Sequence, residues 1–368
     1  MQPLIGPIAI AAALAALAPM AKADEPSGVQ WIRITDNPVR SMWITDAHLT
    51  AREFAALSRI RVEIVHLQRS VVDDEAWHHL ARMDSIRNLV IDDTRISQEA
   101  VEAIGCLSRL RQILVTPATA DHEPGSIAWS PLGRLEHLQS LAVLYGSWDD
   151  DALEAIAPLK SLTHLGIADV QITERGARAL GSLEQLESLL MEGGAVSAEA
   201  LHSFSGLHGL KGLTLRQTEI SSSALRTLVA HGKLASLKLK GPAVIDEVLV
   251  AVGEMASLET LRLPETSVSD EGLHHLTSCE QLKALDLAST TVGDGGIEAL
   301  LVLEGLEVLS LQGTQITDEG LARLAALPKL RALAVGESGV SEEGIESFRA
   351  MRGDVEIGRV LWSWVWGQ

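Results

Sequence analysis

The sequence predicts an α/β fold built from one long array of short repeats, and three observations support this. The chain of 368 residues repeats an L-x-x-L-x-L-like phrase, most often every 24 residues. Within each phrase apolar residues alternate with a period of two, which is typical of a short, half-buried strand. Later in each unit apolar residues recur three apart and mark the buried face of a short helix. The chain is therefore predicted to be a single array rather than two separate domains.

The repeat units can be placed by stepping back along the chain from Leu306, which opens one of them. Thirteen units cover residues 39 to about 353, the first being one residue short and the fourth 28 residues long. Their first residues are Val39, Val62, Ile86, Leu110, Leu138, Leu162, Leu186, Leu210, Leu234, Leu258, Leu282, Leu306 and Leu330.

The twelfth residue of many units is Ser or Thr and is usually followed by Asp or Glu. A hydroxyl at this place caps a helix and an acid suits its first turn. In TQITDEGLARLAAL, residues 314–327, Thr317 is predicted to cap, Asp318 and Glu319 to begin the helix, and Gly320 to allow close packing. Because such acids recur along the array, they are structural rather than catalytic. The predicted caps are Thr50, Ser97, Thr173, Ser197, Ser221, Ser269, Thr317 and Ser341.

The consensus L-x-x-L-x-L-x-x-T-x-[IV]-[ST]-[DE]-x-[GA]-[LI] resembles that of leucine-rich repeat proteins, in the 24-residue T-x-I-T-D-x-G-L style of ribonuclease-inhibitor-like arrays. This resemblance implies a curved α/β solenoid, with parallel strands on the concave face and short helices on the convex face. A hydroxyl residue replaces the family's usual asparagine after the strand. We expect these hydroxyls to form a ladder that bonds the backbone of neighbouring turns: Ser70, Thr94, Thr218, Thr266, Thr290, Thr314 and Ser338.

The overall composition describes an acidic globular protein with an aliphatic core. Hydrophobic residues make up 46%, aromatic residues 3%, and the formal net charge is −19. This charge argues against nucleic acid as a ligand and against adsorption to an anionic membrane surface. The simplest interpretation of the acidity is solubility.

The N-terminus has the layout of a secretory signal peptide. An apolar run from Leu4 to Met20 is followed by Ala21-Lys22-Ala23, which predicts cleavage after Ala23 and an exported protein in the periplasm, cell envelope or medium. No Lys or Arg precedes the run, so an uncleaved anchor is the alternative. Residues 24–38, with the stretch Trp31-Ile32-Arg33-Ile34, are predicted to cap the array.

The other end of the chain, residues 354–368, is predicted to be a C-terminal cap with a tryptophan-rich tail. Trp362, Trp364 and Trp366 alternate, so they share one face of an extended chain. The alternative is an aromatic surface that contacts a partner or the membrane interface.

No residues with the spacing of a catalytic, cofactor or metal site are found in the sequence. His78-His79 and His274-His275 fall within predicted convex helices, where adjacent side chains diverge. Cys106 and Cys279 lie seven units apart, about 34 Å at ~4.8 Å per strand, which is too far for a disulfide. Both are predicted to be buried free thiols, and Trp77, Trp129 and Trp148 are assigned to the core.

Four cations on the predicted concave face form the main candidate binding site. Arg216, Lys238, Lys240 and Arg262 come from three consecutive units, where side chains on adjacent strands lie about 5 Å apart. One interpretation is a site for an acidic group of a partner. The other is a cross-strand charge ladder, because Glu192 neighbours Arg216 and Asp286 neighbours Arg262. No partner is evident for Lys238 or Lys240.

A second candidate is the insertion near residues 119–125 in the lengthened unit, with Tyr145 following in the next unit. A surface loop without a role is the alternative. The sequence therefore predicts an exported, non-enzymatic scaffold that binds another protein through its concave face. The alternative function is a structural or adhesive cell-envelope component that assembles through the tryptophan-rich end.

Overall fold

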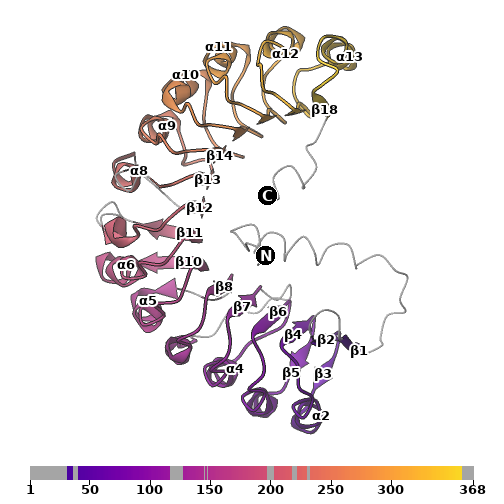
Figure 1. Ribbon diagram of the computed structural model, residues 1–368, viewed down its shortest axis with the longest axis vertical. Coiled ribbons are helices and arrows are strands. Elements are labelled where there is room, and N and C mark those ends of the chain that lie inside the picture. Colours follow the sequence, from indigo (N-terminus) through magenta and orange to yellow (C-terminus); the bar gives the residue numbers. More distant parts are fainter. Residues whose placement is uncertain are drawn as a thin grey trace. The chain divides into compact units, whose positions relative to one another are not determined.

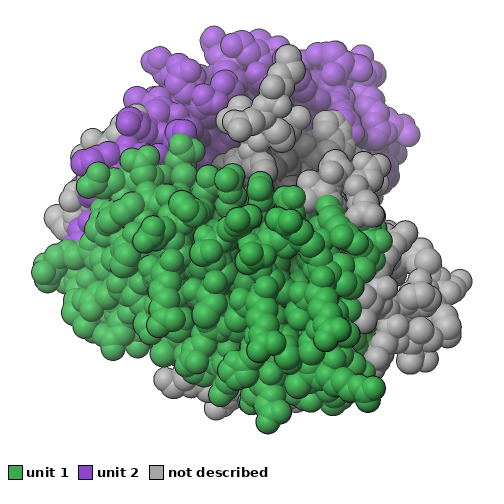
Figure 2. Space-filling view, turned by 60° about the horizontal axis from the view of Figure 1, so that its bottom comes forward, with its two compact units in different colours: residues 1–190 green, residues 191–368 purple. Residues whose placement is uncertain are grey.

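The computed structural model describes residues 31–35, 40–116, 127–144, 146, 148–196, 203–217, 222–229 and 233–358. The chain forms two compact units, residues 1–190 and 191–368, which are coloured green and purple in Figure 2. The division falls inside strand β11 (Ser188–Val196), in the middle of one repeat. Each of these two units, called the first and the second unit below, therefore consists of the same kind of repeat. The predicted signal peptide, the insertion at 119–125, Tyr145 and the three tail tryptophans lie outside the described residues.

The first unit contains a parallel sheet with helices on one side of it (Figure 1). Its parallel strands are β2 (Ser41–Thr45), β4 (Ile64–Gln68), β6 (Asn88–Asp92), β7 (Gln112–Val115), β8 (Ser140–Val143) and β10 (His164–Ile172). Two small pairings add β3 (His48–Leu49) to β5 (Val71–Val72) and β9 (Trp148–Asp149) to β10. The helices are α2 (Ala51–Leu57), η2 (Asp74–Ala76), α3 (Trp77–Leu80), α4 (Gln98–Ile104), η3 (Ser130–Arg134), α5 (Asp150–Ile156) and α6 (Glu174–Gly181).

The outer edge of the first unit's sheet is covered by β1 (Trp31–Thr35). This strand pairs antiparallel with β2, joining Trp31 to Thr45 and Thr35 to Ser41. An unpaired strand edge offers its N–H and C=O groups to any other chain. The stretch that the sequence predicts to be a cap therefore supplies these groups with partners from within the same chain.

The second unit repeats the same arrangement, again with strands on one side and helices on the other (Figure 1). Its parallel strands are β12 (Gly212–Arg216), β13 (Ser236–Lys240), β14 (Thr260–Arg262), β15 (Ala284–Asp286), β16 (Val308–Ser310), β17 (Ala332–Ala334) and β18 (Glu356–Gly358). The helical segments are η4 (Ser203–Gly206), α8 (Ser222–Val229), α9 (Asp246–Gly253), α10 (Asp270–Leu273), η5 (His274–Ser278), η6 (Asp294–Gly296), α11 (Ile297–Leu301), α12 (Asp318–Leu324) and α13 (Glu342–Met351).

Leucines and other aliphatic residues fill the space between strands and helices, as the repeat predicts. Leu309, Leu311 and Leu321 in one such unit are all completely buried. The predicted core tryptophans are also confirmed, because Trp77 and Trp148 are inaccessible and Trp129 is 3% exposed. Trp129 and Trp148 stack with ring centroids 5.2 Å apart and planes 9° apart.

Helix capping follows the prediction wherever the cap is described. Thr317 is the N-cap of α12, its hydroxyl accepts a hydrogen bond from the Glu319 N–H, and Asp318 and Glu319 lie in the first turn. Asp149 caps α5 in the same way. The predicted caps Ser197 and Ser221 lie outside the described residues. The confirmed caps are Thr50, Ser97, Thr173, Ser269, Thr317 and Ser341.

Among the described residues, the predicted hydroxyl ladder is found in the first unit. There the Ala47 N–H donates to Ser70 Oγ at 3.2 Å, and the Ser70 N–H donates to Thr94 Oγ1 at 3.0 Å. In the second unit the hydroxyls instead close their own turn by donating to the carbonyl three residues earlier, which corrects the expectation of a ladder for Thr266, Thr290, Thr314 and Ser338. Thr218 is not among the described residues.

A different ladder, made of aspartates, links the helix starts of successive units. The backbone N–H of Thr317 donates to Asp294 Oδ1 at 2.9 Å, and the Thr317 hydroxyl donates to Asp294 Oδ2 at 2.6 Å. The first acid of one helix thus holds the N-cap residue of the next repeat. The same pair of bonds joins Thr173 to Asp150, Ser269 to Asp246 and Ser341 to Asp318.

The glycine of the T-D-x-G phrase is required by this aspartate. A Cβ atom added to Gly320 would lie 2.1 Å from Asp294 Oδ1, far inside van der Waals contact. Gly176, Gly272 and Gly344 face the same clash with Asp150, Asp246 and Asp318. The predicted close packing at Gly320 is therefore confirmed, and the group that it approaches is the carboxylate of the preceding unit.

We expect Gly320→Ala to destabilise the protein by roughly 1–3 kcal/mol, since the new methyl group overpacks the site. The sign of the stability change tests this role, because Gly→Ala inside a helix ordinarily stabilises a protein by about 1 kcal/mol. Urea denaturation followed by circular dichroism measures the change. In the Asp294→Ala background the clash is gone and the nearest remaining contact is an ordinary 3.5 Å, so Gly320→Ala should be neutral or stabilising there. Equal effects in both backgrounds would contradict this role of Asp294.

Candidate functional site

The sheet face that points away from the helices carries the cation cluster of the second unit. Leu237 and Leu239 of β13 point into the core. Because successive side chains of a strand point to opposite faces, Lys238 and Lys240 lie on the other face of the sheet. Strand pairing places Lys238 beside Arg262 of β14, and Lys240 beside Arg216 of β12. The structure therefore brings together all four cations that the sequence selects.

The two arginines take part in the cross-strand charge ladder that the sequence offers as an alternative. Arg216 Nη1 lies 3.3 Å from Glu192 Oε2, and Arg262 Nε lies 3.3 Å from Asp286 Oδ2. Asp286 is only 5% exposed, so its charge needs a partner and Arg262 supplies it. Both guanidinium groups are held in place by carboxylates of adjacent strands.

Lys240 has a partner, which corrects the expectation that none exists. Its Nζ lies 2.9 Å from Glu265 Oε1. Glu265 is not on the neighbouring strand but in the turn after β14, where its backbone adopts a φ of 57°. Strand register identifies neighbours along the ladder, whereas a residue in this left-handed conformation turns out of it. Strand register alone therefore could not predict the ion pair between Lys240 and Glu265.

Lys238 differs from the other three cations, because it forms no ion pair with any residue that the structure describes. Burial lowers the pKa of its ammonium to about 8, and the nearby charges of Arg262 and Arg216 act in the same direction. Asp286 opposes this shift only in part. A half-buried cation between two others is electrostatically unfavourable until an anion arrives. This arrangement can bind a carboxylate or another acidic group.

A row of mostly apolar side chains runs along the corresponding face of the first unit and contains an aromatic pair that the site predictions from the sequence did not include. Trp43 of β2 and His66 of β4 stack with ring centroids 3.6 Å apart and planes 3° apart. Val90 of β6 and Leu114 of β7 continue the same row. Burial lowers the pKa of His66 to about 4, so its ring is neutral at physiological pH. Trp43 and His66 are each the fifth residue of their repeat, in the repeats that begin at Val39 and Val62, and this shared position could have predicted the pair.

Other candidate groups of the sequence are dispersed. His78, His274 and His275 are exposed on helical segments, and no cluster of three or more metal-ligating side chains occurs in the described part of the chain. Cys279 is buried, which raises the pKa of its thiol to about 11. Cys106 is exposed, contrary to the prediction. The physical reason is its register, since Leu107 and not Cys106 occupies the core position equivalent to Cys279.

Comparison with known proteins identifies the fold. A leucine-rich repeat family model matches residues 278–301 and 306–325. A similar solved structure is an internalin of Listeria monocytogenes, with a TM-score of 0.58 and 15% identity over 88% of this chain and 87% of that one. Another is a leucine-rich repeat protein of Leptospira interrogans, with a TM-score of 0.45 and 15% identity over 86% and 89%. No curated protein matches the chain in sequence.

The family match, the likeness to the internalin structure and the parallel sheets establish that the fold is an α/β leucine-rich repeat solenoid, as the sequence predicts. Assignment to the 24-residue ribonuclease-inhibitor-like type stays a prediction. Among the described residues no helix has the length and apolarity needed to cross a membrane.

We expect Lys238→Met to raise stability at pH 7, because it removes a half-buried charge flanked by two arginines. Since the folded-state pKa is about 8 and the unfolded value is near 10.5, the unfolded chain holds more protons between these values. The native lysine therefore becomes less unfavourable as pH rises through that window. The urea midpoint of the variant should exceed that of wild type by more at pH 7 than at pH 10. A pH-independent difference would contradict this.

Proposed function

We propose that this protein is a non-enzymatic scaffold that holds another protein against the strand face of its second unit. The observation that carries the proposal is Lys238, a half-buried cation without an ion-pair partner among the described residues, set between two arginines. An acidic side chain of the partner protein would complete this cluster. Its negative charge would also oppose the burial and the repulsion that lower the pKa of Lys238.

The arrangement of the cluster favours selective recognition of an acidic group. Glu192 and Asp286 orient Arg216 and Arg262, so these arginines lose little freedom when a ligand arrives. Glu265 occupies Lys240 in the free protein and must share it with the ligand. We therefore assign the main contact to Lys238 and supporting contacts to Arg216, Lys240 and Arg262.

The fold is suited to this role. Proteins with leucine-rich repeats generally mediate protein–protein interactions, and stacked repeats offer an extended, preformed surface. Because such a surface is already ordered before binding, little conformational entropy of the scaffold is lost when the partner binds. Export remains part of the proposal and rests on the signal-peptide layout of residues 1–23, with cleavage after Ala23.

The test is a pull-down from envelope and secreted fractions with wild type and a Lys238→Glu/Lys240→Glu variant. A matched control, Lys233→Glu/Lys329→Glu, changes the net charge equally at two exposed positions of the same unit away from the strand face. All three proteins should first show the same circular dichroism. We expect wild type and the control to capture the same partner, and the strand-face variant to lose it.

The salt dependence of the captured complex provides a second readout. Because salt screens ion pairs, we expect capture by wild type and by the control to weaken to the same extent between 50 and 300 mM salt, values chosen around a Debye length of about 10 Å. Capture of the same partner by all three proteins, with the same salt dependence, would refute a site at Lys238.

A further inference from the structure

The turns that lead into the first strands of the first unit are rich in arginine. Between Lys22 and Lys160 the chain contains no lysine, so every basic residue there is arginine or histidine. Arg61, Arg87 and Arg109 are all exposed on these turns, in a chain with a formal net charge of −19. Arginine offers a planar fork of donors that fits phosphate, sulfate and carboxylate groups better than lysine does.

Register explains why a cavity forms among these arginines. Arg61, Ser85 and Arg109 directly precede the first residues of three successive units, so they occupy the same position in neighbouring turns. At about 4.8 Å per strand, the backbones of the two arginines lie roughly 10 Å apart. The short Ser85 side chain between them is buried and donates to the Val62 carbonyl at 2.7 Å. A slot is therefore left where a longer side chain would stand.

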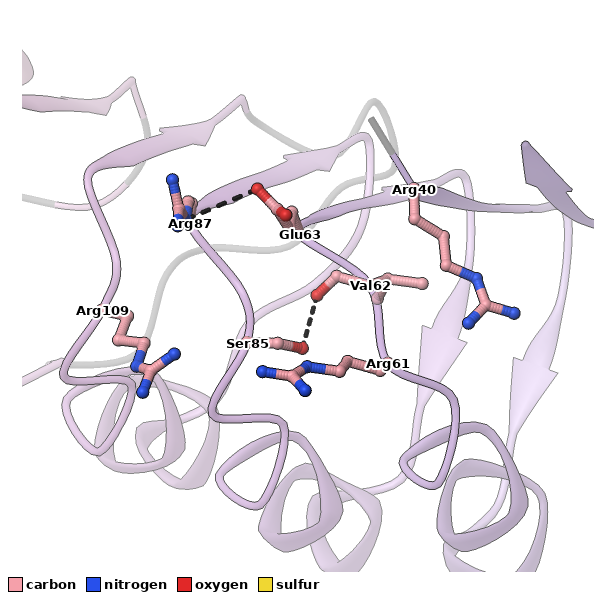
Figure 3. Close-up of a pocket in the computed structure, with 7 residues that line it drawn as sticks. All are labelled: Arg40, Arg61, Val62, Glu63, Ser85, Arg87 and Arg109. Carbon is pink, nitrogen blue, oxygen red and sulfur yellow. Dashed lines mark hydrogen bonds and ion pairs between the residues drawn. The ribbon is translucent and has the colours of Figure 1, made fainter. Parts of the chain in front are cut away.

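A second row of side chains forms the other wall of this slot. Backbone hydrogen bonds of 2.9 and 2.8 Å place Arg40, Glu63 and Arg87 side by side in successive turns. Together the two rows enclose a pocket of about 230 Å³, shown in Figure 3. In that view the guanidinium groups of Arg61 and Arg109 point toward one another beneath Ser85.

The charge balance of the pocket is strongly positive. Its lining contains four arginines and one carboxylate, Glu63, which is already paired with Arg87 at 3.4 Å. Arg61 and Arg109 have no ion pair within the part of the chain that the structure describes. The C-terminal carbonyls of α2 and α4 favour cations nearby. They do not explain why two guanidinium groups face each other across a cavity.

We propose that this pocket binds a tetrahedral dianion, a phosphate or sulfate group, either free or as an ester. Its volume corresponds to that of roughly eight water molecules in the liquid, which is enough for the five heavy atoms of such a group. Two separate guanidinium forks can each engage two oxygens of a tetrahedral anion, whereas a carboxylate has only two oxygens in all. An adjoining hollow that shares Arg61 and Ser85 leaves room for the remainder of an ester.

The experiment is isothermal titration of the purified full chain in low-salt buffer with inorganic phosphate, inorganic sulfate, phenyl phosphate and acetate. The pocket variant is Arg61→Gln/Arg109→Gln. A matched control, Arg52→Gln/Arg95→Gln, removes the same charge from two exposed positions of the same unit outside the pocket. Both variants change exposed side chains only, and circular dichroism verifies their folding.

We expect the pocket variant to bind the tetrahedral anions at least tenfold more weakly than wild type, and the control to change less than twofold. Acetate should bind at least tenfold more weakly than phosphate to wild type. Phenyl phosphate binding as well as phosphate would assign the site to an ester, and its failure to bind would assign it to the free anion. Equal losses in both variants, or no preference over acetate, would overturn the proposal. This test is independent of the strand-face site, which lies in the other unit.

Discussion

The structure depends on the fact that no repeat completes its own hydrogen bonds. Each parallel strand leaves backbone groups that only the next turn can satisfy, and each helix start in the T-D-x-G units needs a carboxylate from the unit before it. Asp294 receives both the N–H and the hydroxyl of Thr317 and lies against Gly320. Stability is therefore shared between neighbours, as expected for stacked repeats.

The same stacking fixes side chains at regular intervals, and both proposed sites use it. On the strand face, register places Lys238 beside Arg262 and near Arg216. Burial and the repulsion from these two arginines together lower the pKa of Lys238. At the turns of the first unit, register aligns Arg61, Ser85 and Arg109, and the short middle residue opens a pocket. In each place the recognition element is a cation that its neighbours do not neutralise.

The differences between prediction and structure have two sources, which are turn and side-chain conformations that register does not encode, and register positions that the prediction did not use. The partner of Lys240 is Glu265, whose positive φ carries it out of the strand ladder. Cys106 is exposed because it is one residue away from the core position that Leu107 fills. The stacking of Trp43 on His66 follows from their equal positions in adjacent repeats, so it could be predicted from the sequence. The hydroxyls of Thr266, Thr290 and Thr314 donate to the carbonyl three residues earlier and so close their own turns, a bond that the repeat spacing does not indicate.

The sequence by itself determined the α/β repeat, the helix caps, the buried tryptophans and the grouping of Arg216, Lys238, Lys240 and Arg262. Periodicity is sufficient for these features, because parallel stacking turns equal positions in successive units into neighbours in space. Only the tertiary structure decided which of the four cations has no ion pair with a described residue, how the aspartates bond to the next repeat, and where a short side chain leaves a cavity. These outcomes depend on side-chain directions and turn conformations, which the spacing of residues along the chain does not encode.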